Sequence, residues 1–270
     1  MRAVPTVLSI AGSDSGGGAG IQADLKAFAR CGVHGMTAIT ALTAQSTVGV
    51  TAIHPIPRDF IVEQVRVVQD DLGVDAVKIG MLGTAEIVEA VNQALDLLEP
   101  GTPIVIDPVM VAESGAVLLD DAAREALARE LLPRATVITP NVPEARVLAG
   151  DGEPGELARK LYELGPENVV VTGGHRDDVI DLFFDGDTFT EIPGERHPDG
   201  AAHGSGCTHS SALAAHLALG RSPLEAARKA RRIAAEAVKH GLRDLGAGAG
   251  PVDVFALTER TAPPAARRVT

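Results

Sequence analysis

The sequence predicts an α/β protein built as an αβα sandwich, in which helices cover both faces of one mostly parallel β-sheet. Short runs rich in β-branched residues alternate with longer segments of helical apolar spacing along most of the chain. Residues 179–192 differ, because two β-rich runs flank a DGD turn, which is typical of a hairpin. We therefore expect antiparallel strands at one edge of the sheet.

The first half of the chain contains three strand–helix repeats. Strands are predicted at TVLSI (6–10), MTAITAL (36–42) and AVKIG (76–80), where β-branched and aliphatic residues cluster. Apolar residues at helical spacing predict helices over 21–30, 60–72 and 87–98. Thr84 is placed to cap the third of these helices.

The second half continues the alternation. Strands are predicted at IVID (104–107), TVIT (136–139) and NVVVT (168–172), and helices over 121–132, 144–149, 157–164, 207–219 and 224–240. No internal repeat or flexible linker divides the chain. We expect one domain over residues 1–255 and a frayed, Pro- and Ala-rich tail over 256–270.

The composition favours a small-molecule protein. The 36 acidic and 24 basic residues give a net charge of −12, which repels phosphate backbones, so no nucleic acid partner is expected. No apolar run is long enough for a membrane span, and the N-terminal segment reads as a first strand rather than a signal peptide. Two cysteines cannot form a disulfide framework, so a cytoplasmic protein with reduced thiols is expected.

Ligands of parallel sheets bind beyond the carboxyl ends of the strands, so the segments that follow the strands are candidate sites. The first, AGSDSGGGAG (11–20), fits neither GxxxxGK[ST] nor GxGxxG. Its many glycines would let the backbone approach a ligand closely, although a plain flexible turn is the alternative. VTGGH (171–175) is another such segment, which either admits a nucleotide or forms an ordinary turn.

Oxygen-bearing side chains follow two other predicted strands. Asp107 ends the strand at 104–107, and Asn141 and Glu144 follow the strand at 136–139. Carboxylate and amide oxygens suit Mg²⁺, which prefers oxygen ligands and keeps several waters. The alternative is that these residues only cap loops and helices.

The stretch AHGSGCTHSS (202–211) places a tight turn before a predicted helix. Gly204, Ser205, Gly206 and Cys207 offer consecutive backbone N–H groups at a helix N-terminus, which is an anion-binding arrangement. A cysteine at this position is expected to have a lowered pKa. The alternative is a small buried thiol.

Taken together, these motifs resemble the ribokinase-like superfamily and, within it, the hydroxymethylpyrimidine/phosphomethylpyrimidine kinases of thiamine biosynthesis. The resemblance covers about residues 5 to 255. It is carried by AGSDSGGGAGIQADLK (11–26), TAQST (43–47), KIGMLG (78–83), DPVM (107–110), TPNVPEA (139–145), GGH (173–175) and HGSGCT (203–208).

The resemblance implies transfer of the ATP γ-phosphoryl group to the hydroxyl of 4-amino-5-hydroxymethyl-2-methylpyrimidine, and then to the resulting monophosphate. Its pyrimidine pocket matches Gly12, Asp24, Gln45, Met81 and Val109. An amide such as Gln45 can answer both the donor and the acceptor of an aminopyrimidine edge.

The other family elements also have counterparts, and a homodimer is expected from the relatives. The catalytic anion hole matches Gly204, Ser205, Gly206 and Cys207, with Cys207 as the base. ATP and phosphate contacts match Asp107, Asn141, Thr172 and Gly174. Mg²⁺ is expected as cofactor, held by Glu144 and Asp107 through water.

Two positions depart from the family pattern. Thr172 stands where many members have lysine, and Ser205 stands where threonine is more usual. Two alternatives remain beside the pyrimidine kinase. One is a pyridoxal or pyridoxine kinase of the same superfamily, and the other is a non-catalytic pyrimidine- or nucleotide-binding protein.

Overall fold

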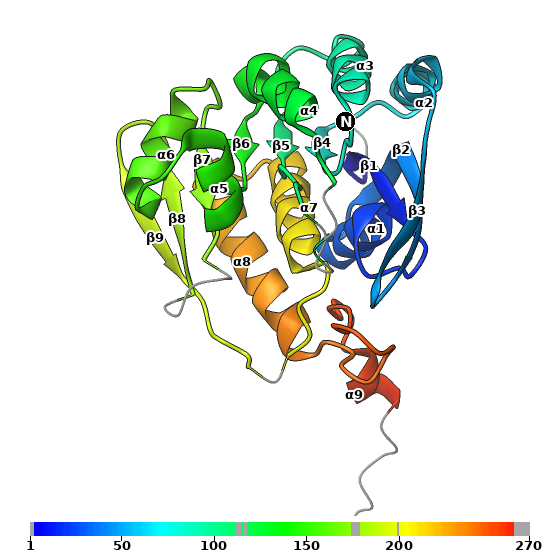
Figure 1. Ribbon diagram of the computed structural model, residues 1–270, viewed down its shortest axis with the longest axis vertical. Helices are drawn as coiled ribbons and strands as arrows, with labels where there is room; N and C mark the ends of the chain where they lie inside the picture. The colour runs from blue at the N-terminus through cyan, green and yellow to red at the C-terminus, as the bar shows by residue number, and fades with distance from the viewer. Residues whose placement is uncertain (1–2, 112–114, 116–117, 174–178, 199, 262–270) are drawn as a thin grey trace, which may run out of the picture.

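In the computed structural model, residues 3–111, 115, 118–173, 179–198 and 200–261 are described (Figure 1). Nine strands within these residues form one sheet in the order β3-β2-β1-β4-β5-β6-β7-β8-β9. The strands are β1 (Thr6–Asp14), β2 (His34–Ser46), β3 (Gly49–Pro55), β4 (Ala76–Ile79), β5 (Ile104–Ile106), β6 (Val137–Ile138), β7 (Val169–Val171), β8 (Ile180–Phe184) and β9 (Phe189–Pro193). The six strands β2, β1, β4, β5, β6 and β7 are parallel neighbours, which confirms the predicted alternation.

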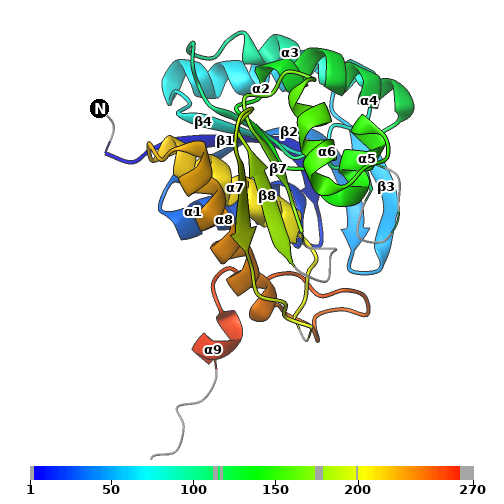
Figure 2. The same cartoon turned by 90° about the vertical axis from the view of Figure 1, so that its left-hand side faces the viewer.

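Helices cover both faces of the sheet (Figures 1 and 2). One face carries α1 (Gly20–Cys31), α7 (Ser205–Ala218) and α8 (Pro223–Lys239). The other carries α2 (Arg58–Asp71), α3 (Ala85–Leu95), α4 (Asp121–Ala126), α5 (Val142–Ala149) and α6 (Pro154–Tyr162). None of the helices in the described ranges has the length and apolar character that a membrane crossing needs.

The strand residues alternate between two hydrophobic cores. In β5, Ile104 and Ile106 pack into the core beneath α2–α6, whereas Val105 packs into the core beneath α1, α7 and α8. Because both faces are buried, the central strands read as continuous apolar runs rather than as an apolar–polar alternation. The alanines Ala212, Ala214 and Ala215 of α7 are fully buried and let this helix lie close to the sheet.

Both edges of the sheet are antiparallel. The hairpin predicted at 179–192 is confirmed, since β8 pairs antiparallel with β7 and with β9. The antiparallel pairing of β2 with β3 was not predicted. Most side chains of β3 are exposed, so the strand carries no run of buried apolar residues that would mark it in the sequence.

One predicted helix and the C-terminal tail differ in kind from what the sequence predicts. The helix expected over 121–132 is α-helical only to Ala126 and then continues as a π-helical turn, Leu127–Leu131, and a 3₁₀ turn, Leu132–Arg134. Pro133 lies in that last turn, and proline has no N–H group with which to continue an α-helix. The segment expected to be frayed over 256–270 contains a short helix, α9 (Leu257–Thr261), and residues 262–270 lie outside the described residues.

Candidate active site

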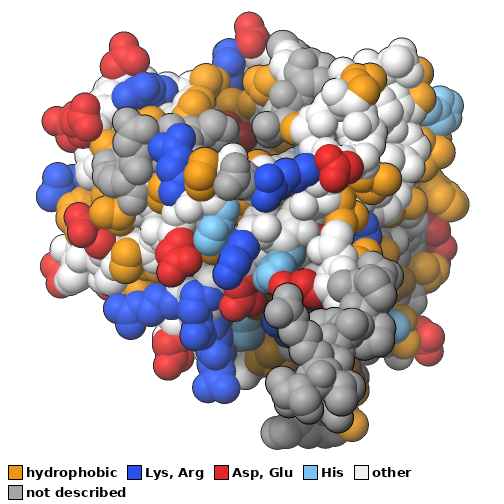
Figure 3. All heavy atoms as spheres, turned by 90° about the horizontal axis from the view of Figure 1, so that it is seen from below, with side chains coloured by type: hydrophobic (Ala, Val, Ile, Leu, Met, Phe, Trp, Pro, Cys, Tyr) orange, Lys and Arg blue, Asp and Glu red, His pale blue; other side chains and the backbone are white. Residues whose placement is uncertain are grey.

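A cavity of about 470 Å³ lies where the parallel strands end. Residues that follow β1, β4, β5, β6 and β7 line it, as expected for a site beyond the carboxyl ends of a sheet. Basic, acidic and histidine side chains are interspersed on this side of the molecule (Figure 3). The predicted site residues that line this one cavity are Gly12, Gln45, Met81, Asp107, Val109, Asn141, Glu144, Thr172, Gly204, Ser205, Gly206 and Cys207.

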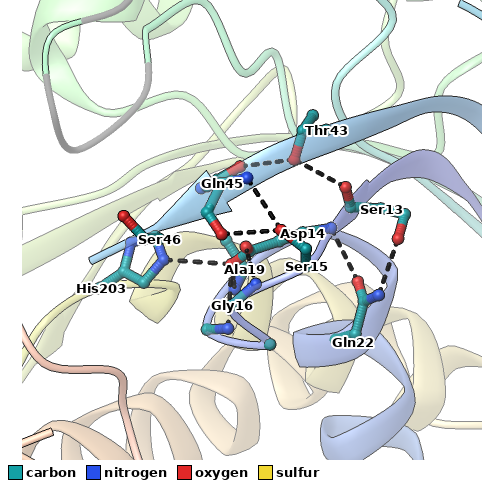
Figure 4. Close-up of polar contacts among 12 residues, drawn as sticks. Ser13, Asp14, Ser15, Gly16, Ala19, Gln22, Thr43, Gln45, Ser46 and His203 are labelled. Carbon is teal, nitrogen blue, oxygen red and sulfur yellow. Dashed lines mark hydrogen bonds and ion pairs between the residues drawn. The ribbon is translucent and has the colours of Figure 1, made fainter. Parts of the chain in front are cut away.

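The glycine-rich loop after β1 is fixed by one carboxylate. Asp14, which is only 2% exposed, accepts hydrogen bonds from the backbone N–H groups of Gly16, Gly18 and Ala19 at 2.7, 3.0 and 2.8 Å (Figure 4). Nε2 of His203 lies 3.3 Å from the same side chain. Burial alone would raise the pKa of Asp14, but the hydrogen bonds from His203 and the backbone outweigh it, so the pKa is lowered. The loop is therefore an ordered part of the cavity wall.

The turn before α7 is locked against this loop. Gly204, the N-cap, has φ = 82°, and a side chain there would overlap the carbonyl oxygen of Gly18. The N–H group of Ser205 donates to Ala202 O at 2.9 Å, which closes the turn. The first N–H groups of an α-helix have no intrahelical acceptor, so the turn presents donors to an anion in the cavity. Residues 204–207 therefore lie at the cavity wall, and their binding of an anion stays a prediction.

The prediction of a reactive thiolate at Cys207 is wrong for this structure. Burial raises the pKa of the Cys207 thiol to about 12; Asp24 and Asp107 raise it further, and Lys78 opposes them. The N–H group of Gly20 hydrogen-bonds the sulfur and also acts in the lowering direction. Desolvation is the largest of these causes, so the pKa of Cys207 is raised where the sequence predicted a lowered one.

Asp24 does not line the cavity, contrary to its predicted contact with the pyrimidine. Its side chain is fully buried and forms an ion pair with Lys78, with Nζ at 2.9 and 3.1 Å from the two carboxylate oxygens. The same oxygens accept from Ser9 at 2.6 Å and from Ser211 at 2.7 Å. Every carboxylate oxygen is thus engaged, which leaves none for a ligand.

Lys78 was missed as a functional candidate, although the sequence carries a signal. It stands in AVKIG, a predicted buried strand, and a lysine in such a strand needs a buried partner. The structure places its side chain at the cavity wall, where the ammonium influences Cys207 and Asp107. The lack of a side chain at Gly80 makes room for it, since a Cβ there would lie 2.7 Å from Nζ.

Asn141 and Glu144 cap a helix and also line the cavity. Oδ1 of Asn141 accepts from the N–H group of Glu144 at 2.8 Å, and Oε2 of Glu144 accepts from the N–H group of Asn141 at 3.0 Å. This capping box starts α5. The capping role that the sequence left open is therefore real, and it does not remove either residue from the site.

Two acidic residues of the cavity have raised pKa values. Burial, followed by the Asp107 carboxylate, raises the pKa of Glu144 to about 8. Burial also raises the pKa of Asp107, which accepts from Ser210 Oγ at 3.0 Å. A bound cation would relieve this repulsion, and two carboxylates are the partial ligand set that Mg²⁺ completes with water and phosphate. No group of three or more His, Cys, Asp or Glu side chains in the described part of the chain would hold a metal ion alone.

Thr172 lies at the end of β7 and lines the cavity, with its N–H group donating to Pro140 O at 2.8 Å. Gly174, the other predicted nucleotide contact after β7, lies outside the described residues. The cavity wall here also includes Val179, Asp181, His209 and Arg231. These four residues were not predicted, because His209 and Arg231 are distant in the chain from Val179 and Asp181 and the four form no motif.

Comparisons with known proteins identify a matching family and similar chains. A family model described as phosphomethylpyrimidine kinase matches residues 14–253. A hydroxymethylpyrimidine/phosphomethylpyrimidine kinase from Rhizobium meliloti is 46% identical over 257 residues, which cover 92% of this chain and 96% of that protein.

Two solved structures show the same fold. The pyridoxal kinase from Staphylococcus aureus in complex with ADP has a TM-score of 0.86 and 36% identity, with 95% of each chain covered. The phosphomethylpyrimidine kinase from Clostridium difficile 630 has a TM-score of 0.77 and 38% identity, covering 87% of this chain and 100% of that one.

Proposed function

The chain belongs to the phosphomethylpyrimidine kinase family, and we propose that it phosphorylates 4-amino-5-hydroxymethyl-2-methylpyrimidine and then its monophosphate with ATP. One observation carries this proposal. A single cavity joins the predicted pyrimidine contacts, including Gln45 and Met81, to the anion-binding turn at Gly204–Cys207. The acceptor hydroxyl and the transferred phosphoryl group can therefore meet in one enclosed space.

The hydrogen bonding around Gln45 fits an aminopyrimidine. Thr43 Oγ1 lies 2.9 Å from Ser13 O and 3.1 Å from Gln45 Oε1 (Figure 4). A hydroxyl has one proton, and the carbonyl of Ser13 can only accept it. Both contacts become hydrogen bonds if the oxygen and nitrogen of the Gln45 amide are exchanged, so that its nitrogen donates to Thr43 Oγ1. The amide oxygen is then left to accept from the exocyclic amino group of the ring.

The packing around Met81 supports a flat ring on the pyrimidine side. The methyl group of Met81 fills the space beside Gly12, where a Cβ would lie 2.9 Å from it. Val109 lines the same part of the wall as an apolar side chain. A thioether and an aliphatic group beside a glycine form a smooth apolar surface, on which an aromatic ring packs without losing hydrogen bonds.

The transfer forms a bond from the substrate oxygen to the γ-phosphorus and breaks the bond from that phosphorus to ADP. We assign the charge on the transferring group to the backbone donors of the Gly204–Cys207 turn. Cys207 holds its own proton, so its sulfur orients the hydroxyl rather than removing the proton. Asp107 lines the same cavity with a raised pKa and is suited to accept that proton.

We propose Mg²⁺ as the cofactor, held by Glu144 and Asp107 through water, with Asn141 and Thr172 beside the ATP phosphates. The raised pKa of Glu144 supports this assignment, because two neighbouring buried carboxylates favour a cation between them. When bound, the metal would neutralise charge on the phosphate oxygens.

A pyridoxal kinase is the second candidate, because the Staphylococcus aureus pyridoxal kinase matches the fold with a TM-score of 0.86. A coupled assay of ADP release separates the candidates. We expect turnover of the hydroxymethylpyrimidine and of its monophosphate with MgATP, with a kcat/KM at least about tenfold above that for pyridoxal, the difference that one well-placed hydrogen bond makes. Faster turnover of pyridoxal would favour the second candidate. Tight binding without ADP release would favour a non-catalytic binding protein.

We further propose that the chain forms a homodimer through the β2–β3 edge of the sheet. β3 is the outermost strand at this edge, and its backbone has no strand beyond it in the sheet order. Leu42, Val48 and Ile53 are 45%, 64% and 48% exposed there. Exposed apolar side chains beside an open strand edge favour covering by a second copy.

A further inference from the structure

We propose that Ser15, in the glycine-rich loop after β1, is a positioning residue that holds Gln45 in place for the pyrimidine. The Ser15 hydroxyl donates to the carbonyl oxygen of Gln45 at 2.8 Å and accepts from its N–H group at 2.8 Å (Figure 4). Gln45 lines the cavity and Ser15 does not, so Ser15 acts on the site through Gln45. The inference rests on the proposed function, in which Gln45 binds the pyrimidine.

The end of β1 explains why a side chain takes this role. The parallel pairing of β1 with β2 reaches Asp14, opposite Thr43, and ends there. In an extended strand the N–H and C=O groups of one residue point to the same side, so those of Gln45 face the space beyond the end of β1. The hydroxyl of Ser15 is both donor and acceptor, and it bonds both groups as a paired strand residue would.

The loop that carries Ser15 is fixed on both sides of this residue. The N–H group of Asp14 donates to Oε1 of Gln22 in α1 at 2.9 Å, and the N–H group of Gly16 donates to the Asp14 carboxylate at 2.7 Å (Figure 4). The loop also lies close against β2, since a Cβ at Gly16 would be 3.3 Å from Gln45 O. The bonds from Ser15 therefore restrain Gln45 relative to a rigid part of the molecule.

The side chain of Gln45 is held from the same place. Thr43 Oγ1 lies 3.1 Å from Gln45 Oε1 and donates to Ser13 O at 2.9 Å. The backbone and the side chain of Gln45 are thus both tied to residues 13–15. Restraining both before the ring arrives reduces the conformational entropy that is lost on binding.

Without Ser15, the position of Gln45 would depend on the end of a two-stranded ribbon. Gln45 is next to the last residue of β2, and within the described residues β2 pairs there with the edge strand β3 alone. The register of that pairing also shifts between Ala44 and Gln45. A two-stranded ribbon is only marginally stable by itself, so the bonds from Ser15 supply the support that a neighbouring strand would give.

Steady-state kinetics of Ser15→Ala test the proposal, with Ser15→Thr as the variant that keeps the hydroxyl. We expect the KM for the pyrimidine to rise about fivefold in Ser15→Ala, because the amide remains but its backbone bonds are lost. The KM for ATP and kcat should stay within about twofold of wild type, since a loss of ground-state binding leaves kcat unchanged. Ser15→Thr should recover most of the affinity.

Ser46→Ala is the matched control. Ser46 follows Gln45 in β2, and its hydroxyl accepts from the N–H group of Val48 at 3.4 Å within the β2–β3 turn. Its loss should leave the KM for the pyrimidine unchanged.

A double-mutant cycle separates positioning from a general structural effect. In a Gln45→Ala background, Ser15→Ala should raise the KM for the pyrimidine by less than about twofold further, because the side chain that Ser15 places is already absent. Two residues that act independently would multiply their effects.

Amide hydrogen exchange in the ligand-free protein, measured by NMR, does not depend on activity. The N–H group of Gln45 should exchange roughly tenfold faster in Ser15→Ala than in wild type, because its acceptor is lost. Ser15→Thr and Ser46→Ala should exchange as wild type does, and the amides of β4 should be unchanged in all variants.

The inference is overturned if Ser15→Ala leaves the KM for the pyrimidine within about twofold of wild type, or if it multiplies fully with Gln45→Ala. It is also overturned if Ser46→Ala raises this KM equally, if Ser15→Thr recovers no affinity, or if exchange at Gln45 is unchanged. A wild-type protein that releases no ADP with MgATP and either pyrimidine would instead overturn the proposed function. Exchange at Gln45 would then still decide whether Ser15 holds its backbone.

Discussion

At the scale of single residues, the environment of Cys207 decides its chemistry. A helix N-terminus lowers a thiol pKa by stabilising the thiolate, and this favoured a reactive cysteine in the sequence. The structure adds burial and two carboxylates, Asp24 and Asp107, which together hold the pKa at about 12. These neighbours lie far from Cys207 in the chain, so the local motif did not reveal them.

This environment predicts slow alkylation of Cys207 by iodoacetamide. A thiol with a pKa of about 12 is ionised to only ~10⁻⁴ at pH 8, so we expect the rate to be at least about 100-fold below that of a free thiol. The measurement uses a Cys31→Ser background, because Cys31 is the other cysteine of the chain. If alkylation is fast and its rate reaches half of its maximum below pH 8, Cys207 has the lowered pKa that the sequence predicted.

Gln45→Ala should separate the two substrates. Gln45 lines the cavity and meets Thr43, and its remaining amide atom is assigned to the ring's exocyclic amino group. We expect the KM for the pyrimidine to rise about fivefold to tenfold, equivalent to about 1 kcal/mol, with the KM for ATP unchanged. The measurement is steady-state kinetics with each substrate varied in turn. A rise in the ATP KM alone would move Gln45 to the nucleotide side.

The Lys78–Asp24 pair makes the strongest residue-scale prediction for stability. Lys78→Met leaves the Asp24 carboxylate buried without its cation, which should lower the free energy of unfolding by about 3–5 kcal/mol. The double variant Lys78→Met/Asp24→Asn removes both charges and should recover much of that loss. Urea denaturation measures the free energy of unfolding of the single and the double variant. A single variant within about 1 kcal/mol of wild type would contradict a compensated buried pair.

At the scale of elements, β5 and β3 show what the sequence reveals and what it does not. IVID is a short apolar run between Pro103 and Pro108, and it forms β5 because both faces of the sheet centre are buried. GVTAIHP has similar residues but forms an edge strand, and its place depends on the long β2 beside it. Local pattern therefore predicts central strands, whereas an exposed edge is decided by tertiary pairing.

The candidate site divides in the same way. Local motifs, such as the turn at residues 204–207 before α7, were found because each is complete within a few residues. Asp24 was misplaced, because its partner Lys78 is 54 residues away and takes the carboxylate from the ligand. Asp181, His209 and Arg231 were missed because three elements bring them together and none of them carries a motif alone.

The capping box of α5 links one helix to the pH dependence of stability. The pKa of Glu144 rises from its ordinary 4.5 to about 8 in the folded protein. The folded state therefore keeps this proton where the unfolded state has lost it. The resulting stabilisation is full below about pH 4.5 and is lost as the pH rises through about 8.

Glu144→Gln should remove this dependence. Glutamine keeps an acceptor for the N–H group of Asn141 but cannot ionise. We expect wild type to lose stability relative to Glu144→Gln between pH 5 and pH 8, by roughly 3–4 kcal/mol, since each pH unit between the two pKa values is worth about 1.4 kcal/mol. Urea denaturation at a series of pH values, without magnesium or nucleotide, measures the difference. Parallel curves for the two proteins would show that Glu144 is not perturbed.

At the scale of the whole molecule, segments that are far apart in the sequence meet at one edge of the sheet. Parallel strands all end on the same side, so segments spread from the glycine-rich loop after β1 to the turn before α7 meet around one cavity. The sheet supplies rigidity, and the short segments after each strand supply the chemistry. A kinase of this kind can therefore change its acceptor by altering a few strand-end residues while the fold stays the same.

The β2–β3 edge of the sheet predicts how the protein associates. If the β2–β3 edge is covered by a second copy, light scattering should give twice the chain mass of 27.8 kDa. Val48→Asp and Ile53→Asp place charges among the exposed apolar side chains of this edge and should shift the protein to the monomer. Leu219→Asp is the control, because Leu219 is similarly exposed, at 40%, but lies at the end of α7. A wild-type mass of one chain would refute the dimer, and an equal effect of all three substitutions would place the contact elsewhere.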